Sequence, residues 1–228
     1  MTPLQTHNDY RFGSHSGLTH AQMRTLVEQF HKPPADAPEM LAGRLRAHIV
    51  EISGLGRVVI KHYLRGGVIR HVNRQTYIGL TKPRSRSEFE LLEHVRRIGV
   101  SAPEPVAFAV RGHLLYRAWL VTREIPKAQS LARISRTDPA RAEAAMAPIG
   151  RQMQRLIGHG ILHVDLHPGN VLVDSKDSVF FIDFDKAQTG RKNQDRLRTR
   201  YIERWRRAVE KYQLPGFLHT QLETALLY

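Results

Sequence analysis

Three polar side chains stand at fixed spacing between His163 and Asp185, namely Asp165, Asn170 and Asp183. Phosphoryl transfer to an alcohol needs a carboxylate that orients the acceptor hydroxyl, and oxygen ligands that hold a metal ion on the phosphates. Asp165 suits the first task, and Asn170 and Asp183 suit the second. The pattern therefore favours phosphoryl transfer, and the alternative is an ordinary hairpin with scattered acids.

Two short apolar runs, residues 171–173 and 179–182, surround a polar turn at residues 175–178. Such a pattern predicts a β-hairpin, which would bring residues 170 and 183 together at one end. A helix is expected just upstream, over residues 139–157, with Asp138 as its cap. We interpret His163 as a packing residue of the loop rather than as a base.

The same stretch resembles the catalytic core of the protein-kinase-like superfamily. The catalytic-loop pattern H-x-D-L-x-x-x-N is present from His163 to Asn170, and Asp183 begins a D-F-D in place of the metal-binding D-F-G. Asp185 replaces the last glycine, and His167 replaces the lysine that protein kinases place two residues after the catalytic aspartate. These departures look more like the small-molecule and sugar kinases of the superfamily, such as aminoglycoside and choline kinases.

Further upstream, Lys61 ends a β-branched run that resembles the kinase V-A-I-K strand, whose lysine contacts nucleotide phosphates. The alternative is a surface lysine at a strand end. The helix expected over residues 85–98 offers Glu88 as the partner of Lys61, with Glu90 as the rival position. Gly43 is the candidate for a phosphate-covering loop, and a plain turn fits it equally well.

A second hairpin is expected from residues 107–110 and 114–124. It ends where kinases place the interlobe hinge, at which backbone groups bind adenine. By position, the Arg123 carbonyl and the Ile125 N–H are the candidates, and a simple strand-to-loop exit is the alternative.

The scatter of motifs also resembles a narrower group, the Kdo kinases of the lipopolysaccharide-core sugar kinase family. The resemblance covers residues 40–212 and is carried by residues 61–67, 84–92, 103–106 and 124–126 together with the catalytic motifs. It implies ATP and Mg²⁺ or Mn²⁺ as cofactors, and a lipid-linked acidic sugar, Kdo on lipid A, as the acceptor. Arg65 and His167 are the candidates for binding that acceptor.

The composition is that of a globular chain, with 41% hydrophobic and 25% charged residues and a formal net charge of +14. This charge indicates an anionic partner, such as nucleic acid, anionic lipid or a phosphorylated substrate. The sequence has no apolar run long enough to cross a bilayer and no pattern of a signal peptide. An ATP-dependent reaction would place the protein in the cytoplasm, and the resemblance to lipopolysaccharide-core kinases implies a peripheral position on the inner face of the bacterial inner membrane.

The expected fold is α+β, a two-lobed protein-kinase-like fold with a reduced C-lobe. The predicted boundaries are residues 1–36 for an N-terminal arm or helix, 37–125 for the N-lobe and 126–228 for the C-lobe. The residues after Asp185 are too few for the large helical C-lobe of a protein kinase, and no A-P-E motif is present. They instead predict a basic amphipathic helix over residues 194–212.

Four alternatives remain from the sequence. A core heptose kinase would share the motifs, and a small atypical serine/threonine protein kinase is disfavoured by the missing peptide platform. A basic nucleic-acid-binding protein would need basic strands with aromatic residues between the basic ones, or the motif of a recognition helix. The sequence has neither. A pseudokinase scaffold is disfavoured by the presence of Lys61, Asp165, Asn170 and Asp183.

Overall fold

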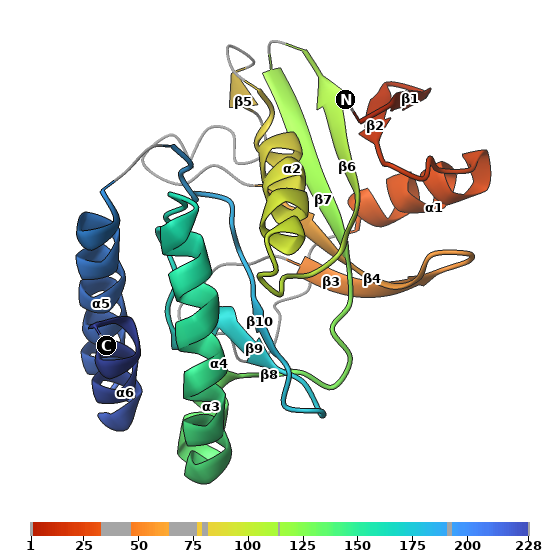
Figure 1. The fold of residues 1–228 in the computed structure, drawn as a ribbon. Helices are drawn as coiled ribbons and strands as arrows, with labels where there is room; N and C mark the ends of the chain where they lie inside the picture. The colour runs from red at the N-terminus through yellow and green to blue at the C-terminus, as the bar shows by residue number, and fades with distance from the viewer. Residues whose placement is uncertain are drawn as a thin grey trace. The chain divides into compact units, whose positions relative to one another are not determined.

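The structure is a computed structural model that describes residues 2–32, 47–63, 77–78, 82–113, 115–190 and 193–227. These residues divide into two compact units (Figure 1). Unit 1 holds the described residues of 2–93 and 104–124. Unit 2 holds residues 94–103 and the described residues from Ile125 onward. The content is mixed α+β, as the sequence predicts.

Within the described residues, unit 1 contains an antiparallel sheet of seven strands in the order β1-β2-β6-β7-β4-β3, with β5 paired to β7. The strands are β1 (Leu4–His7), β2 (Tyr10–Gly13), β3 (Ala47–Ile52), β4 (Gly56–His62), β5 (Tyr77–Ile78), β6 (Pro105–Gly112) and β7 (Leu115–Arg123). The hairpin predicted from residues 107–110 and 114–124 is present as β6–β7, with Ala109 opposite Trp119, and β3 pairs with β4 in a further antiparallel hairpin.

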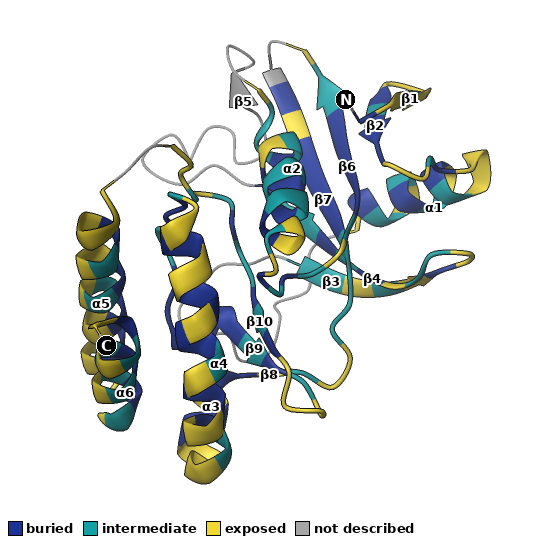
Figure 2. Ribbon diagram, in the orientation of Figure 1, coloured by how far each residue is buried: buried dark blue, intermediate teal, exposed yellow. Residues whose placement is uncertain are grey.

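Side chains on alternate faces of this sheet contact different helices. On one face, Ala109 and Trp119 join the core with Leu26 and Phe30 of α1 (His20–Phe30). On the other, Phe108 packs against Phe89 of α2 (Arg84–Arg97), with ring centroids 5.3 Å apart. Figure 2 shows the buried stripe of α1 and its exposed opposite side. The sheet is therefore covered on both faces, which explains why β6 is nearly all apolar.

Strands β1 and β2 were not predicted from the sequence. β2 pairs with β6, and Gly13 lies opposite Phe108 at the end of that pairing. A Cβ on Gly13 would lie 2.2 Å from the Phe108 ring, so a side chain there would collide with it. The close approach of β2 to the ring therefore requires glycine at this position.

Unit 2 combines a small antiparallel sheet with helices. Among its described residues the strands are ordered β10-β9-β8, which are β8 (Gln129–Ser130), β9 (Val171–Val173) and β10 (Val179–Phe181). The helices are α3 (Leu131–Thr137), α4 (Pro139–Gly158), the short 3₁₀ helix η2 (Pro168–Asn170), α5 (Gln194–Lys211) and α6 (Phe217–Leu227). The predicted catalytic hairpin is present as β9–β10, with Val171 paired to Phe181.

The helices of unit 2 pack around one apolar core. Asp138 caps α4 by accepting a hydrogen bond from the Arg141 N–H, as predicted. The α5 stripe is buried, and its Trp205 donates to the Leu218 carbonyl of α6 at 2.9 Å. Gly150 of α4 meets Ala225 so closely that a Cβ would lie 2.6 Å from the alanine Cβ. In the described part of the chain, no helix combines the length and apolar composition needed to cross a bilayer.

Candidate active site

Lys61 and Glu88 form a buried ion pair in unit 1. Lys61 Nζ lies 2.8 and 3.0 Å from the two carboxylate oxygens of Glu88, and the side chains are 13% and 3% exposed. Glu90, the rival position, instead pairs with Lys82 and Arg86 on the surface. The structure therefore brings Lys61 to Glu88, and the catalytic roles of the two residues stay predictions.

Tyr63 belongs to the same cluster and was missed in the sequence. It follows Lys61 by two positions, so both side chains leave the extended chain on the same side. Its hydroxyl donates to Glu88, and Lys61 Nζ lies 5.2 Å from the centre of its ring. The carboxylate is thus held by an ammonium and a phenol, which fixes its orientation.

His163 connects the loop before η2 to the segment after β10, which carries Asp183. Its Nε2 donates to the Ile182 carbonyl at 2.9 Å, and its ring centroid lies 4.5 Å from that of Phe184. Its backbone N–H donates to the Tyr201 hydroxyl at 2.8 Å. Burial lowers the pKa of His163, so the ring is neutral with the proton on Nε2. These contacts support the packing role expected for His163.

His167 has a similar structural contact. Its Nδ1 accepts a hydrogen bond from the Gly169 N–H at 3.0 Å and so caps η2. Burial, with a further contribution from the Arg204 charge, lowers the pKa of His167 to about 4. The ring is therefore neutral at physiological pH, and its remaining proton lies on Nε2. The predicted role in acceptor binding would use that Nε2–H group, because Nδ1 already has a partner.

The three chemistry-bearing residues of the first motif come together at one end of the β9–β10 hairpin. Asn170 Nδ2 donates to the Asp165 carbonyl at 2.9 Å, and the Ile182 N–H donates to the Asn170 carbonyl at 3.0 Å. Asp183 follows directly, with a left-handed backbone at φ 65°. Such a conformation costs a non-glycine residue roughly 1–3 kcal/mol and is concentrated at functional sites.

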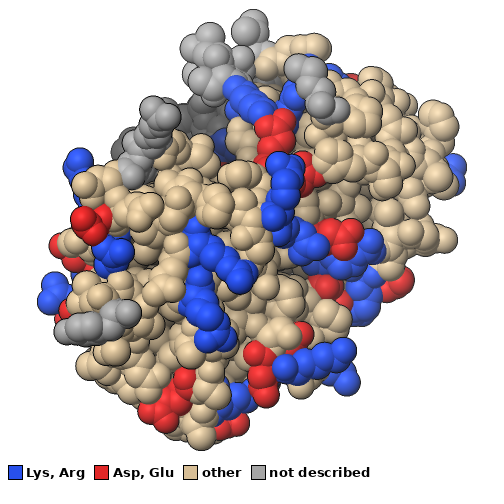
Figure 3. All heavy atoms as spheres, viewed as in Figure 1, with Lys and Arg blue, Asp and Glu red and all other residues tan. Residues whose placement is uncertain are grey.

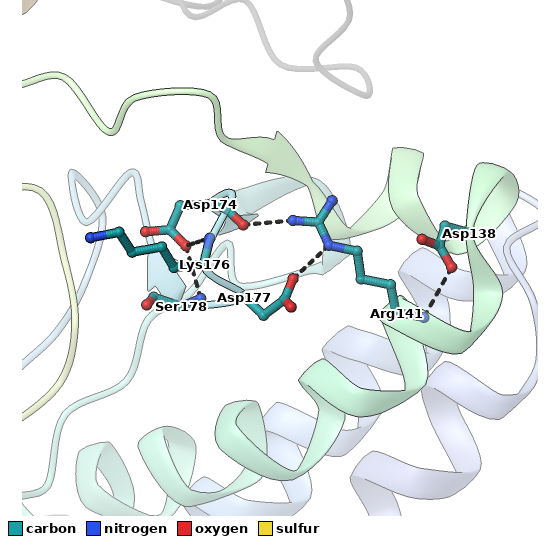
Figure 4. Close-up of polar contacts among 6 residues, drawn as sticks. All are labelled: Asp138, Arg141, Asp174, Lys176, Asp177 and Ser178. Atoms are coloured by element: carbon teal, nitrogen blue, oxygen red, sulfur yellow. Dashed lines mark hydrogen bonds and ion pairs between the residues drawn. The ribbon is translucent and has the colours of Figure 1, made fainter.

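The opposite end of the hairpin is fixed to α4 (Figure 4). Arg141 donates to the Asp177 carboxylate and to the Asp174 carbonyl, both at 2.6 Å. The Asp174 carboxylate accepts the N–H groups of Lys176 and Ser178, at 2.8 and 2.9 Å. The turn is thus held by four hydrogen bonds, which fix the far end of the hairpin between Asn170 and Asp183.

The carboxylate of Asp165 contacts two cations. Lys186 Nζ donates to Oδ2 at 2.9 Å, and Arg204 Nη2 lies 3.6 Å from Oδ1. The Asp165 and Lys186 side chains are 30% and 64% exposed. Gln188, just after Lys186, exchanges two backbone hydrogen bonds with Leu162, which holds this segment beside the loop. Sequence reasoning found neither cation.

Residues 23–223 match the lipopolysaccharide kinase (Kdo/WaaP) family. The chain belongs to this family. The resemblance drawn from the sequence motifs is thereby confirmed.

Three relatives named 3-deoxy-D-manno-octulosonic acid kinase illustrate the similarity. The Vibrio cholerae protein is 36% identical over 67% of this chain and 65% of its own length. The Vibrio parahaemolyticus protein is 31% identical over 78% of this chain and 74% of its own length. The Xylella fastidiosa protein is 34% identical over 66% of this chain and 60% of its own length. The similarity to the first and third relatives thus spans less than two thirds of their length.

The predicted site residues that remain in this member of the lipopolysaccharide kinase family are Arg123, Ile125, Gly43 and Arg65. Arg123 ends β7, where its guanidinium donates to the Leu55 carbonyl and lies 3.7 Å from Glu104, and Ile125 begins the next unit. Gly43 and Arg65 lie outside the described residues. Within the described residues, no group of three or more His, Cys, Asp or Glu side chains is arranged to hold a metal ion.

Proposed function

We propose that this chain is an ATP-dependent kinase that phosphorylates a hydroxyl of Kdo, 3-deoxy-D-manno-octulosonic acid, in the inner core of lipopolysaccharide. The observation that carries the proposal is the family match over residues 23–223. It is supported by relatives of 31–36% identity that are named as kinases of this sugar acid. The acceptor in this proposal is Kdo attached to lipid A.

Asp165 is the residue that acts on the acceptor. Its carboxylate accepts the hydrogen bond of the attacking hydroxyl and takes the proton as the new oxygen–phosphorus bond forms. The bond between the γ-phosphorus and the bridging oxygen breaks, and ADP leaves with that electron pair. The Asn170 amide supports the reaction by holding the Asp165 backbone carbonyl, which fixes the position of the carboxylate.

Asn170 and Asp183 suit a metal ion bound together with nucleotide phosphates. Both offer oxygen donors, and the Asn170 amide nitrogen is already bound to a carbonyl, which leaves its oxygen as the group for a ligand. Mg²⁺ is usually held by one or two protein oxygens plus phosphates and waters, so a three-residue protein cluster is not required. When bound, Mg²⁺ or Mn²⁺ would neutralise charge on the phosphate oxygens.

Lys61 is the residue of unit 1 that holds the nucleotide phosphates, with Glu88 and Tyr63 fixing its ammonium group. The role is assigned by resemblance to the V-A-I-K strand of kinases, whose lysine contacts the nucleotide phosphates. The backbone of Arg123 and Ile125 would bind adenine, and Gly43 would lie in the loop over the phosphates.

We also infer that the two units are the lobes of a protein-kinase-like fold with a reduced C-lobe, with boundaries near 37–125 and 126–228. The antiparallel sheet with α2 in unit 1, and the helices with the catalytic hairpin in unit 2, support this inference. The segment 1–36 contributes β1 and β2 to the same sheet, so its described part adds to the first lobe rather than forming a free arm.

We propose that the enzyme works on the cytoplasmic face of the inner membrane, to which its net charge of +14 attracts it. Each Lys or Arg near an anionic surface contributes about 1 kcal/mol, within a Debye length of about 8–10 Å. On the face drawn in Figure 3, basic side chains are spread over the surface with acidic ones between them. Binding to anionic vesicles that survives high salt, or that equals binding to neutral vesicles, would contradict this account.

The test of function is a set of three acceptors. The protein is incubated with ATP and Mg²⁺, with and without EDTA, against lipid A carrying one Kdo, lipid A carrying heptose, and a generic protein substrate. A phosphate mass shift on the Kdo acceptor alone supports the proposal. A shift on the heptose acceptor alone would identify a heptose kinase, and a shift on protein an atypical protein kinase. No transfer by the folded protein would favour a pseudokinase, or a nucleic-acid-binding protein if RNA binds tightly.

A further inference from the structure

Arg204 is placed firmly beside the catalytic carboxylate. It lies on α5, one turn after Tyr201, whose hydroxyl donates to the Ile161 carbonyl at 3.0 Å and accepts from the His163 N–H at 2.8 Å. These bonds join α5 to the residues just before Asp165. The Arg204 guanidinium then reaches to within 3.6 Å of Asp165 Oδ1, with 29% of its side chain exposed.

Among the described residues, the Arg204 guanidinium makes one long ion pair, to Asp165, and no hydrogen bond. At 3.6 Å its approach to Asp165 is too long for a hydrogen bond, and it makes no hydrogen bond to any other residue in the described part of the chain. By contrast, Lys186 is hydrogen-bonded to the other oxygen at 2.9 Å and is 64% exposed. Arg204 therefore presents a planar set of N–H donors, partly withdrawn from solvent, at the place where the acceptor must bind.

The surroundings of Arg204 reinforce its preference for an anion. His167 lies close enough that the Arg204 charge helps to lower the pKa of the imidazole, so this ring stays neutral and does not compete for a negative group. The described charged groups that contact Asp165 are Lys186 and Arg204. An acceptor whose hydroxyl binds Asp165 at about 2.6–3.2 Å must therefore place its neighbouring substituents next to a guanidinium.

We propose that Arg204 binds the carboxylate of the sugar-acid acceptor while Asp165 holds the hydroxyl that is phosphorylated. This inference rests on the proposed function and adds to it the residue that distinguishes an acidic sugar from a neutral one. Arg binds carboxylates through two parallel N–H···O bonds, which fixes orientation as well as charge. A neutral sugar would leave these donors without a partner, so the enzyme discriminates against it.

The experiment compares two acceptors that differ only at the carboxyl group. Kdo-lipid A and the methyl ester of its Kdo carboxyl are presented in the same detergent micelles, and kcat/KM is measured for each. Wild-type enzyme should prefer the free acid by roughly 10- to 100-fold, the range of a charge-assisted hydrogen bond. Arg204→Gln should lose about that factor on the free acid and prefer it by less than about threefold. Arg204→Lys should show an intermediate preference, because it keeps the charge and loses the planar fork.

Two controls separate this role from the general charge of α5. Arg200 and Arg207 are exposed on the same helix and form no ion pair within the described chain. Arg200→Gln and Arg207→Gln remove the same charge, so they should keep the wild-type ratio between the two acceptors even if binding to micelles weakens. Thermal unfolding of each variant verifies that it is folded.

Each outcome decides between sources of the anion. If Arg204→Gln lowers kcat/KM equally on both acceptors, the guanidinium does not bind the acceptor carboxylate and the inference is wrong. A raised KM for ATP with unchanged acceptor preference would mean that Arg204 serves the nucleotide phosphates instead. Wild-type activity on Kdo-lipid A tests the proposed function separately. If that activity is absent, the proposed function fails and this inference fails with it.

Discussion

Two lysine–carboxylate pairs of this molecule differ in burial and in the number of groups that hold them. In unit 1, Lys61 contacts both oxygens of Glu88, at 2.8 and 3.0 Å, and the side chains are 13% and 3% exposed. In unit 2, Lys186 contacts one oxygen of Asp165 at 2.9 Å, and the side chains are 64% and 30% exposed. Tyr63 adds a further donor to the first pair.

The difference matches what each carboxylate has to do. In the proposed site, Glu88 only has to keep Lys61 in place, and a largely buried, doubly contacted pair does that without rearrangement. In the proposed reaction, Asp165 exchanges its partner for a substrate hydroxyl in every catalytic cycle. An ion pair in contact with water contributes only about 0–1 kcal/mol, so the exchange is easy. The first pair is therefore expected to be structural and the second to be replaceable.

Asp165→Asn is expected to have the largest effect on activity and little effect on stability. Transfer should fall by roughly 10²–10⁴-fold, because the amide cannot take the proton of the hydroxyl. The free energy of unfolding should change by less than about 1 kcal/mol, since the two ion pairs that are lost are in contact with water and one of them is long. Single-turnover kinetics, ATP binding by calorimetry and urea unfolding measure the three quantities. Near-normal turnover would mean that another group acts on the acceptor.

Glu88→Gln is expected to lower both stability and activity. It removes the carboxylate charge that faces the largely buried Lys61 ammonium, which should reduce the free energy of unfolding by about 3–5 kcal/mol. Glu90→Gln is the matched control on the same helix, where the surface pairs with Lys82 and Arg86 should contribute about 0–1 kcal/mol.

Adding Lys61→Met to Glu88→Gln should recover part of the lost stability, because the double variant removes both charges of the pair. Denaturant unfolding of the two single variants and the double variant gives the coupling between them. Strictly additive losses would contradict the view that the buried pair acts as one unit.

Much of the site could be predicted because its signals are local in sequence. The loop from Asp165 to Asn170 and the hairpin to Asp183 carry fixed spacing and alternating apolar runs, and both have the predicted form. Lys61 and Glu88 could be named as a pair only by resemblance. The choice over Glu90 needed the structure, because residues two apart on a helix point to different sides.

The features that could not be predicted depend on contacts that leave no regular spacing in the sequence. Strands β1 and β2 have four residues each, too few for a clear alternation; β2 is stabilised by pairing with β6, and β1 by pairing with β2. Lys186 and Arg204 reach Asp165 from distant segments with long side chains, so no fixed spacing marks them. Asp138 is both the C-cap of α3 and the N-cap of α4. Because no loop separates the two helices, α3 was not predicted from the sequence.

His167 sharpens the comparison, because it is a buried group two residues after the partly exposed Asp165. Its folded pKa of about 4 lies below the ordinary value of 6.5, so the unfolded chain binds more protons between these values. The free energy of unfolding should therefore fall as pH decreases from about 6.5 to about 4, by on the order of 3 kcal/mol from this residue. His163, whose pKa is also lowered, acts in the same direction.

The variant that tests this is His167→Asn, which can still accept the Gly169 N–H without titrating. Urea unfolding at about pH 7.5 and about pH 5 should show a smaller loss of stability in the variant than in the wild type. An equal loss in both proteins would mean that His167 is not the group responsible. Activity is measured in parallel, because His167 is also a candidate for acceptor binding.

Lys186→Ala is expected to have the smallest effect on stability. The lost pair is exposed, so the free energy of unfolding should change by less than about 1 kcal/mol, and by less still above about 0.5 M salt, where the charges are screened. Urea unfolding at low and high salt measures this. A salt-independent loss above about 2 kcal/mol would place this pair in the same class as Lys61–Glu88. Asp165 would then be held too tightly to exchange Lys186 for a hydroxyl, and its assignment as the acceptor-orienting group would have to be abandoned.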